Sequence, residues 1–170
     1  MEGARLIKLP SKSPSEMTQE EFEERMKEVI GALYADGIRT YDIFIRDHVR
    51  FESASLGPPT TVTYRATVAP ELCNKLGTLH GGCAATLVDV LTSTILLALG
   101  QPGSVSRSLG LKYVRAAPMG VDILITSELV HVGRKLALLK CEIRRADTRD
   151  VCVVGEHDKA NTGPIDSAKL

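Results

Sequence analysis

The residues of this sequence that are best suited to chemistry surround the start of one long apolar segment. A His-Gly-Gly triplet at 80–82 leads directly into residues 83–99, which are apolar or small except for Asp89. Glycines that open a helix leave backbone N–H groups uncovered at the positive end of the helix dipole, where a developing oxyanion is stabilised. Burying a lone carboxylate costs several kcal/mol unless it is paired or used. The pattern predicts an oxyanion site followed by a functional carboxylate.

The spacing of the helix start and Asp89 predicts whether one chain or two would form the site. Gly81 and Asp89 are eight residues apart, which corresponds to about 12 Å of rise along a helix. One reacting carbon atom cannot contact both residues of the same chain. If both act on one substrate, two subunits with antiparallel helices must share the site, and a monomer is expected to be inactive.

Length and charge exclude several classes of protein. A chain of 170 residues is expected to form one domain with a sizeable core. Its 21 Lys and Arg residues balance its 21 Asp and Glu residues, so no nucleic-acid partner is indicated. Asp89 and the polar triplet 92–94 interrupt the longest apolar stretch, which argues against a membrane span.

The cellular compartment is predicted from the N-terminus and the cysteines. The first ten residues lack the apolar core of a secretory signal. The four cysteines have no C-x-x-C spacing, which favours a reduced intracellular protein. We expect a cytoplasmic location, and Arg5, Lys8 and Lys12 leave a mitochondrial leader open as the alternative.

The N-terminal part of the chain is predicted to hold one helix. Residues 1–17 are expected to be a flexible leader, followed by a helix over 18–37 that ends near Asp36-Gly37. Thr18 and Glu21 have the spacing of a capping box at its start. The apolar face of this helix repeats with helical period and consists of Phe22, Met26, Val29, Ile30 and Leu33.

The rest of the chain, residues 38–160, is predicted to be one domain of strands around the apolar helix. Its residues 41–51 are β-rich but alternate irregularly, and a tail follows at 161–170. Further strands are predicted at 61–68, 106–114, 121–132, 136–145 and 151–157, with turns at 57–59, 133–135 and 146–150. An antiparallel sheet wrapped around one buried helix, an α+β fold, is the compact arrangement that this order favours.

The stretch Asn74-Lys-Leu-Gly-Thr-Leu-His-Gly-Gly82, followed by Ala-Thr-Leu-Val-Asp89, resembles the hotdog-fold acyl-CoA thioesterases of the phenylacetate-degradation type, and among them the thioesterase superfamily member 2 branch. The resemblance implies a hotdog fold and hydrolysis of acyl-CoA to free CoA and a carboxylic acid. It also implies a homodimer or homotetramer, with no cofactor and no metal.

The same resemblance implies roles for individual residues. The Gly81 amide would polarise the thioester carbonyl, and the Asp89 carboxylate of the other subunit would act as general base or as nucleophile. Asn74 would hold the water or the carbonyl, and His80 would fix the Gly-Gly turn by a hydrogen bond to the backbone. In ordinary structural roles, Asn74 would instead form an Asx turn, and the glycines would allow close packing.

A serine on the strand after the helix is also implied, and Ser106 matches it. Two positions depart from the family pattern, because Ser108 and Gly110 stand where the family usually has Asp and Asn. Ser104 and Ser108 are therefore alternatives to Ser106.

Basic side chains near the hairpin turns are candidates for binding the CoA phosphates. An ordinary solvated charge is the alternative at each position. The candidates are Arg115, Arg134, Lys135, His157 and Lys159.

Two other functions fit the same residues. A hotdog hydratase or dehydratase would use His80 with Asp89 on the substrate's α and β carbons. A non-catalytic acyl-CoA-binding protein would keep the fold without turnover. Release of free CoA distinguishes the thioesterase from both.

Overall fold

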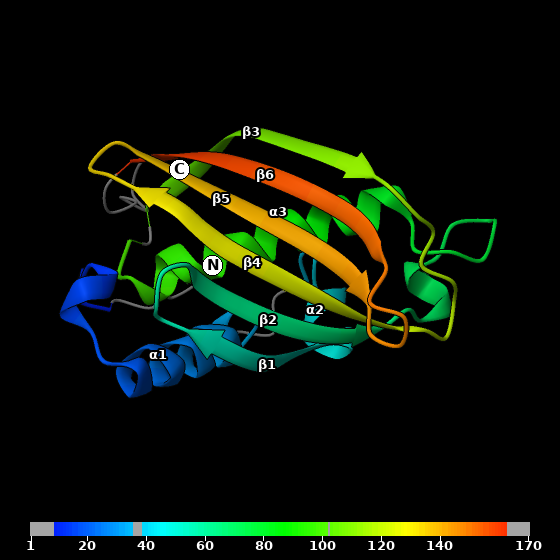
Figure 1. Cartoon of the computed structure of the whole chain (residues 1–170), viewed down its shortest axis with the longest axis horizontal. Coiled ribbons are helices and arrows are strands. Elements are labelled where there is room, and N and C mark those ends of the chain that lie inside the picture. The colour runs from blue at the N-terminus through cyan, green and yellow to red at the C-terminus, as the bar shows by residue number, and fades with distance from the viewer. Residues whose placement is uncertain (1–8, 36–38, 102, 163–170) are drawn as a thin grey trace.

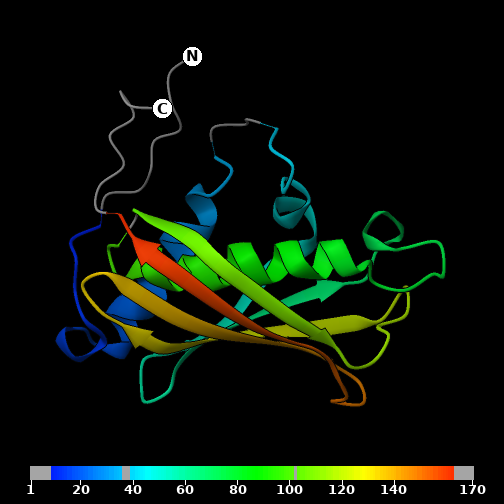
Figure 2. The ribbon, with the colours of Figure 1, turned by 90° about the horizontal axis from the view of Figure 1, so that it is seen from above.

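Six strands form one antiparallel sheet that curves around a long helix, α3 (Figures 1 and 2). The computed structural model describes residues 9–35, 39–101 and 103–162. The strand order is β1-β2-β4-β5-β6-β3, so that β1 and β3 are the edges. The strands are β1 (Val49–Ser55), β2 (Thr60–Thr67), β3 (Ser104–Tyr113), β4 (Asp122–Val132), β5 (Leu136–Arg145) and β6 (Val151–Asn161). The helices are α1 (Gln19–Ala32), α2 (Phe44–His48) and α3 (Gly81–Ala98), with 3-10 turns η1 (Pro14–Glu16) and η2 (Pro70–Leu72).

The central helix α3 forms the core together with the inner face of the sheet. Its side chains Leu87, Leu91 and Ile95 are buried in one cluster with Ile125 of β4 and Leu139 of β5. The helix has the length and apolar character of a membrane span, but half of it is buried within the fold, as a core helix requires. This arrangement confirms the predicted hotdog fold.

The helix α1 packs beside α3 and β1 through the predicted apolar face. Phe22, Met26 and Val29 are fully buried. Thr18 caps the helix by accepting a hydrogen bond from the Glu21 amide at 3.1 Å. The Glu21 carboxylate does not complete the predicted capping box. It instead binds the side chain of Lys12, which lies before the helix.

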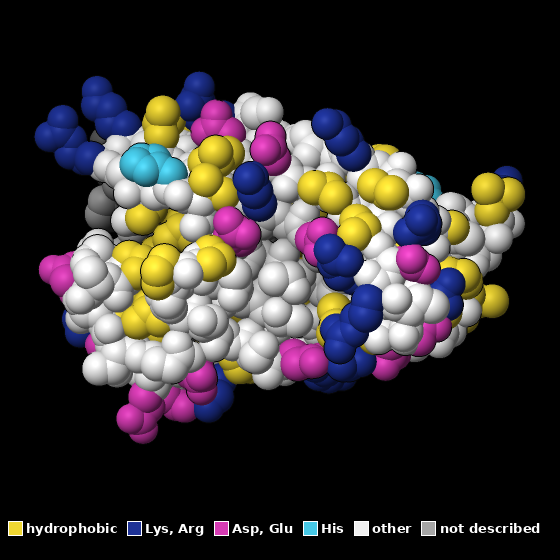
Figure 3. Space-filling view, in the orientation of Figure 1, with side chains coloured by type: hydrophobic (Ala, Val, Ile, Leu, Met, Phe, Trp, Pro, Cys, Tyr) yellow, Lys and Arg dark blue, Asp and Glu magenta, His cyan; other side chains and the backbone are white. Residues whose placement is uncertain are grey.

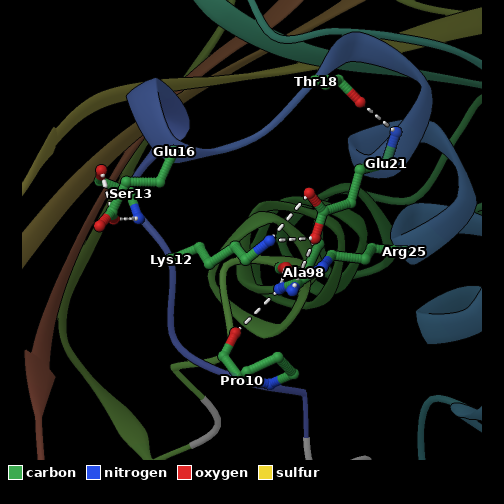
Figure 4. A network of polar contacts seen from close by, with 8 residues as sticks. All are labelled: Pro10, Lys12, Ser13, Glu16, Thr18, Glu21, Arg25 and Ala98. Atoms are coloured by element: carbon green, nitrogen blue, oxygen red, sulfur yellow. Dashed lines mark hydrogen bonds and ion pairs between the residues drawn. The ribbon is translucent and has the colours of Figure 1, made fainter.

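A network of polar contacts fastens the N-terminal segment to the C-terminal end of α3 (Figure 4). Arg25, only 7% exposed, donates to the carbonyls of Ala98 at 3.1 Å and Pro10 at 2.9 Å. It also pairs with Glu21 at 3.0 Å, and the Lys12 amide donates to Leu99 at 3.0 Å. A cation at the last carbonyls of a helix is stabilised by the helix dipole. Residues 9–17 of the predicted leader therefore contact the core.

Two predicted boundaries differ from the structure. The helix α1 ends at Ala32, and the predicted end at Asp36-Gly37 lies outside the described residues. The β-rich segment 41–51 was predicted without a helix, but it contains the helical turn α2 before β1 begins. The reason is a local bonding pattern: the Asp42 carboxylate accepts from Tyr34 at 2.8 Å, and its carbonyl accepts from the Ile45 amide at 3.0 Å.

The outer face of the sheet, which is turned away from α3, carries Lys and Arg side chains interspersed with Asp and Glu (Figure 3). Arg65 on β2 pairs there with Glu52 of β1 at 2.7 Å and with Asp122 of β4 at 3.4 Å. Hydrophobic and uncharged side chains lie between these charges on the same face.

Candidate active site

The N-terminus of α3 is closed by His80 in a way that leaves one amide free. His80 is the N-cap, and its Nδ1 atom accepts from the Gly82 amide at 2.9 Å, as predicted. Its carbonyl accepts from the Ala84 amide, also at 2.9 Å. Among the hydrogen bonds of the described residues, none uses the Gly81 amide. The first amide of the helix can therefore donate to a ligand.

Tyr113, at the end of β3, supports the same turn. Its hydroxyl donates to the Gly81 carbonyl at 2.9 Å, while the residue remains 58% exposed. The ring lies 3.4 Å from the position that a Cβ on Gly81 would occupy, which is ordinary contact. Tyr113 was not predicted from the sequence, because a tyrosine at a strand end has no distinctive spacing.

Asn74 occupies the loop before α3 and organises it. Its Oδ1 atom accepts from the Leu76 amide at 2.8 Å, and its Nδ2 atom donates to the Thr78 hydroxyl at 3.0 Å. Asn74 is thus an Asx-turn residue. A side-chain amide has two N–H groups, so the second remains able to donate to a substrate or water.

Gly81 and Asn74 line the same cavity, which has a volume of about 370 Å³. This size lies within the range of small-molecule sites. Arg115 lies at the cavity as well and pairs with Asp150 at 2.8 Å. Most of the other lining residues are small or apolar: Thr78, Leu79, Ala84, Tyr113, Val114, Ala116, Ala117, Cys152 and Val153.

Asp89 lies two turns further along α3 and meets the inner face of the sheet. Its side chain is 47% exposed in the single chain, so it is less buried than the sequence pattern indicated. The Ser106 hydroxyl of β3 donates to Asp89 Oδ1 at 2.9 Å. Ser106, rather than Ser104 or Ser108, is therefore the serine that contacts the carboxylate.

Two residues of β6 complete this cluster. His157 is fully buried, with Nε2 2.8 Å from Ser106 Oγ and 3.3 Å from Asp89 Oδ1. Its Nδ1 atom lies 2.7 Å from the Thr92 hydroxyl of α3. Lys159, only 4% exposed, donates to Ser106 at 3.3 Å. Burial, together with the nearby Lys159 charge, lowers the pKa of His157 to about 4 against the opposing effect of the Asp89 charge. Burial also lowers the pKa of Lys159, which the Asp89 charge partly offsets.

Comparison with known proteins identifies the family. The sequence profile of the thioesterase superfamily matches residues 76–152. Human acyl-coenzyme A thioesterase 13 is 36% identical over 103 residues, which cover 59% of this chain and 73% of the relative. This chain belongs to the thioesterase superfamily. The matched segment includes Gly81, Asp89 and Ser106, and it excludes Asn74 and both β6 residues of the cluster.

Solved structures of the superfamily agree with the fold. Thioesterase superfamily member 2 from mouse superposes with a TM-score of 0.71 at 28% identity, covering 85% of this chain and 98% of the mouse chain. The zebrafish protein gives a TM-score of 0.68 at 31% identity, covering 85% and 99%. The resemblance read from residues 74–89 is thereby confirmed.

Apart from Arg115, which lines the cavity, the predicted phosphate contacts divide into two groups. Arg134 and Lys135 are exposed in the turn between β4 and β5, where binding CoA phosphates remains a prediction. For His157 and Lys159 the prediction needs correction, because their side chains are buried under β3 and directed at Ser106. Alternation along β6 is the signal that could have placed them, since Val153, Gly155, His157 and Lys159 share its inner face.

Proposed function

We propose that this member of the thioesterase superfamily hydrolyses acyl-CoA thioesters to free CoA and a carboxylic acid. The observation that carries the proposal is the free Gly81 amide at the positive end of α3, which borders a cavity also lined by Asn74. The name of the human relative, acyl-coenzyme A thioesterase 13, supports the same substrate class.

The Gly81 amide would hold the thioester carbonyl and then the tetrahedral oxyanion. Such a donor stabilises the charge that develops in the transition state, and losing one typically costs about 100- to 1,000-fold in rate. The free N–H of Asn74 would supply a second donor from the loop. The acyl group would extend into the cavity, where the side chains of Leu79, Val114 and Val153 would contact an aliphatic chain.

The carboxylate would come from a second copy of the chain. Gly81 and Asp89 belong to one continuous helix, so about 12 Å of rise separates them within a chain. The edge strand β3 is largely exposed, which leaves it free to pair with another chain. A homodimer with antiparallel α3 helices would bring Asp89 of one protomer to Gly81 of its partner, and two dimers could form a homotetramer.

Asp89 would act as general base for a water molecule or as nucleophile. Its Oδ1 atom accepts from Ser106, whereas Oδ2 has no partner among the described residues. Ser106 would therefore orient the carboxylate and leave one oxygen for the water or the thioester. Arg134 and Lys135 would bind the CoA phosphates at the rim.

The test is release of free thiol from short, medium, long and aryl acyl-CoAs. Wild type should release CoA, and Asp89→Ala and Asp89→Asn should lose at least about 100-fold in kcat. Asp47→Ala, at an exposed carboxylate of α2, is the matched control and should retain activity. Near-wild-type turnover by Asp89→Ala would remove Asp89 from the mechanism.

Two outcomes with wild-type protein would overturn the proposal. Acyl-CoA binding without thiol release would indicate the non-catalytic binding protein. Addition of water to a crotonyl-type substrate without CoA release would indicate the hydratase.

A further inference from the structure

A buried lysine and a buried histidine lie behind the carboxylate, and the proposed chemistry does not require contact with either. Lysine is almost never fully buried unless it is paired. Lys159 is nevertheless 4% exposed, and Ser106 is its hydrogen-bond partner in the described part of the chain. Burying an ammonium and an imidazole beside one serine is costly, so the arrangement calls for an explanation.

The hydrogen atoms of this cluster can be assigned from the charge of the carboxylate. The ionised side chain of Asp89 can only accept hydrogen bonds, and the Ser106 hydroxyl has a single hydrogen. If that hydrogen pointed to His157 Nε2, lone pairs of Ser106 would face Asp89 Oδ1 at 2.9 Å. If His157 carries its proton on Nε2, it donates to Ser106, and Ser106 donates to Asp89.

The other end of the chain of hydrogen bonds is consistent with this assignment. With Nε2 protonated, the neutral ring of His157 needs a donor at Nδ1, and the Thr92 hydroxyl lies 2.7 Å away. Thr92 also lies 2.7 Å from the Val88 carbonyl. In this arrangement the lone pairs of the Thr92 hydroxyl face the Val88 carbonyl, whereas in the opposite one the lone pairs of Ser106 would face the Asp89 carboxylate. Repulsion from a full negative charge costs more than repulsion from a carbonyl dipole, so the carboxylate determines the direction of these hydrogen bonds. Burial keeps the imidazole neutral at pH 7 by lowering its pKa to about 4.

We propose that His157 and Lys159 are positioning residues that act on the reaction through Ser106. They donate to its oxygen, so that its one hydrogen is directed at Asp89. Without the hydrogen bond from Ser106, the half-exposed Asp89 side chain would be free to rotate away from the shared site. The inference rests on the proposed hydrolysis, and it replaces the role at the CoA phosphates that the sequence suggested for both residues.

The test compares kcat and KM for free-thiol release by the dimeric form of the whole 170-residue chain. Lys159→Met and His157→Leu should each lower kcat about tenfold, the effect of one lost hydrogen bond, and leave KM within about twofold. His157→Gln keeps an N–H at the position of Nε2 and should stay within about threefold of wild type. Lys140→Met makes the same chemical change at an exposed site on the outer face of β5 and should be neutral.

A double-mutant cycle separates positioning from a merely structural role. In a Ser106→Ala background, Lys159→Met should cause no further loss of kcat, because the group through which it acts is gone. Additive losses would overturn the proposal, as would a raised KM with unchanged kcat, which is the signature of a phosphate contact. Each rate is divided by the fraction of folded protein, which thermal melting measures. If Lys159→Met fails to fold, the comparison of His157→Leu with His157→Gln still tests the proposal.

Failure of this inference is distinguishable from failure of the proposed function. Wild type without thiol release would overturn the hydrolysis itself. Wild-type turnover that is unchanged in Lys159→Met and His157→Leu would overturn only the positioning role.

Discussion

The Nδ1 atom of His80 accepts the amide hydrogen of Gly82 at 2.9 Å, and the bond leaves the amide of the intervening Gly81 without a partner among the described residues. The histidine thereby caps the helix with its side chain while the adjacent donor stays available. The contact is close because residue 82 has no side chain: a Cβ there would lie 3.2 Å from Nδ1. The shape of the proposed oxyanion site therefore depends on a local contact between His80 and Gly82.

Gly82→Ala should disturb this cap. The added methyl must push the His80 ring away, so we expect a loss of about 1 kcal/mol in the free energy of unfolding and about tenfold in kcat. Gly31→Ala, in the exposed last turn of α1, is the matched control, because nothing lies within 4 Å of the position that its Cβ would occupy. That change should stabilise the protein by about 0.5–1 kcal/mol. Full activity of Gly82→Ala would show that the cap does not shape the site.

Mixing two inactive variants should restore activity if the site is shared. Asn74→Ala and Asp89→Ala damage opposite halves of each site, so a mixed dimer keeps one intact site of two. Random re-association after co-expression should give about one quarter of wild-type activity per chain, since half of the dimers are mixed. Asp89→Ala mixed with Asp89→Asn should remain inactive. Failure of the first pair to complement would place both groups in one chain.

Acid should destabilise the protein through His157. Its pKa is about 4 in the folded protein against an ordinary value of 6.5. Between these values the unfolded chain binds a proton that the folded chain does not. The free energy of unfolding therefore falls as the pH decreases from 6.5 to 4, by up to about 3 kcal/mol.

Denaturant titrations of wild type and His157→Gln at pH 7.5 and 4.5 measure this effect. Carboxylates titrate in both proteins, so the difference between their pH dependences isolates the histidine. Wild type should lose more stability than the variant, whereas equal losses would mean that His157 titrates normally.

Removing the exposed charges of the β4–β5 turn should weaken CoA binding without slowing the chemistry. Arg134→Ala combined with Lys135→Ala is expected to raise KM for acyl-CoA about tenfold and to leave kcat within about twofold. An acyl-pantetheine thioester, which lacks the nucleotide phosphates, serves as the control substrate and should be hydrolysed equally by both proteins. An equal rise in KM for both thioesters would contradict a phosphate contact.

Arg25→Leu should loosen the N-terminal segment from α3. The change removes charge-assisted hydrogen bonds to Ala98 and Pro10 and leaves both carbonyls without that donor, so the free energy of unfolding should fall by about 2–3 kcal/mol. Lys27→Leu removes an exposed ion pair with Glu24 on the same helix and should change the free energy of unfolding by less than about 0.5 kcal/mol. Equal free energies of unfolding for Arg25→Leu and Lys27→Leu would mean that the polar network contributes little to stability.

Features that depend on neighbouring residues were predictable from the sequence. Strand alternation, the apolar run of α3 and the His80 cap all arise within a few positions of the chain, so their pattern can be read directly. The segment 41–51 was the exception, since the hydrogen bond from Tyr34 to Asp42 helps to hold a helical turn in β-rich sequence.

The partners of Asp89 were decided only by the tertiary structure. Ser106 faces Lys159 across the β3–β6 pairing, next to a bulge between Ser106 and Ser108, and more than fifty residues separate the two in the chain. Such a register is set by the packing of the whole sheet against α3 rather than by any local pattern. The sequence by itself therefore determined the family, and it predicted the oxyanion donor and the carboxylate. Only the tertiary structure showed that Ser106, among three candidate serines, contacts Asp89. It also showed that His157 and Lys159, which were predicted to bind phosphate, lie on the inner face of the sheet, because β6 continues to Asn161.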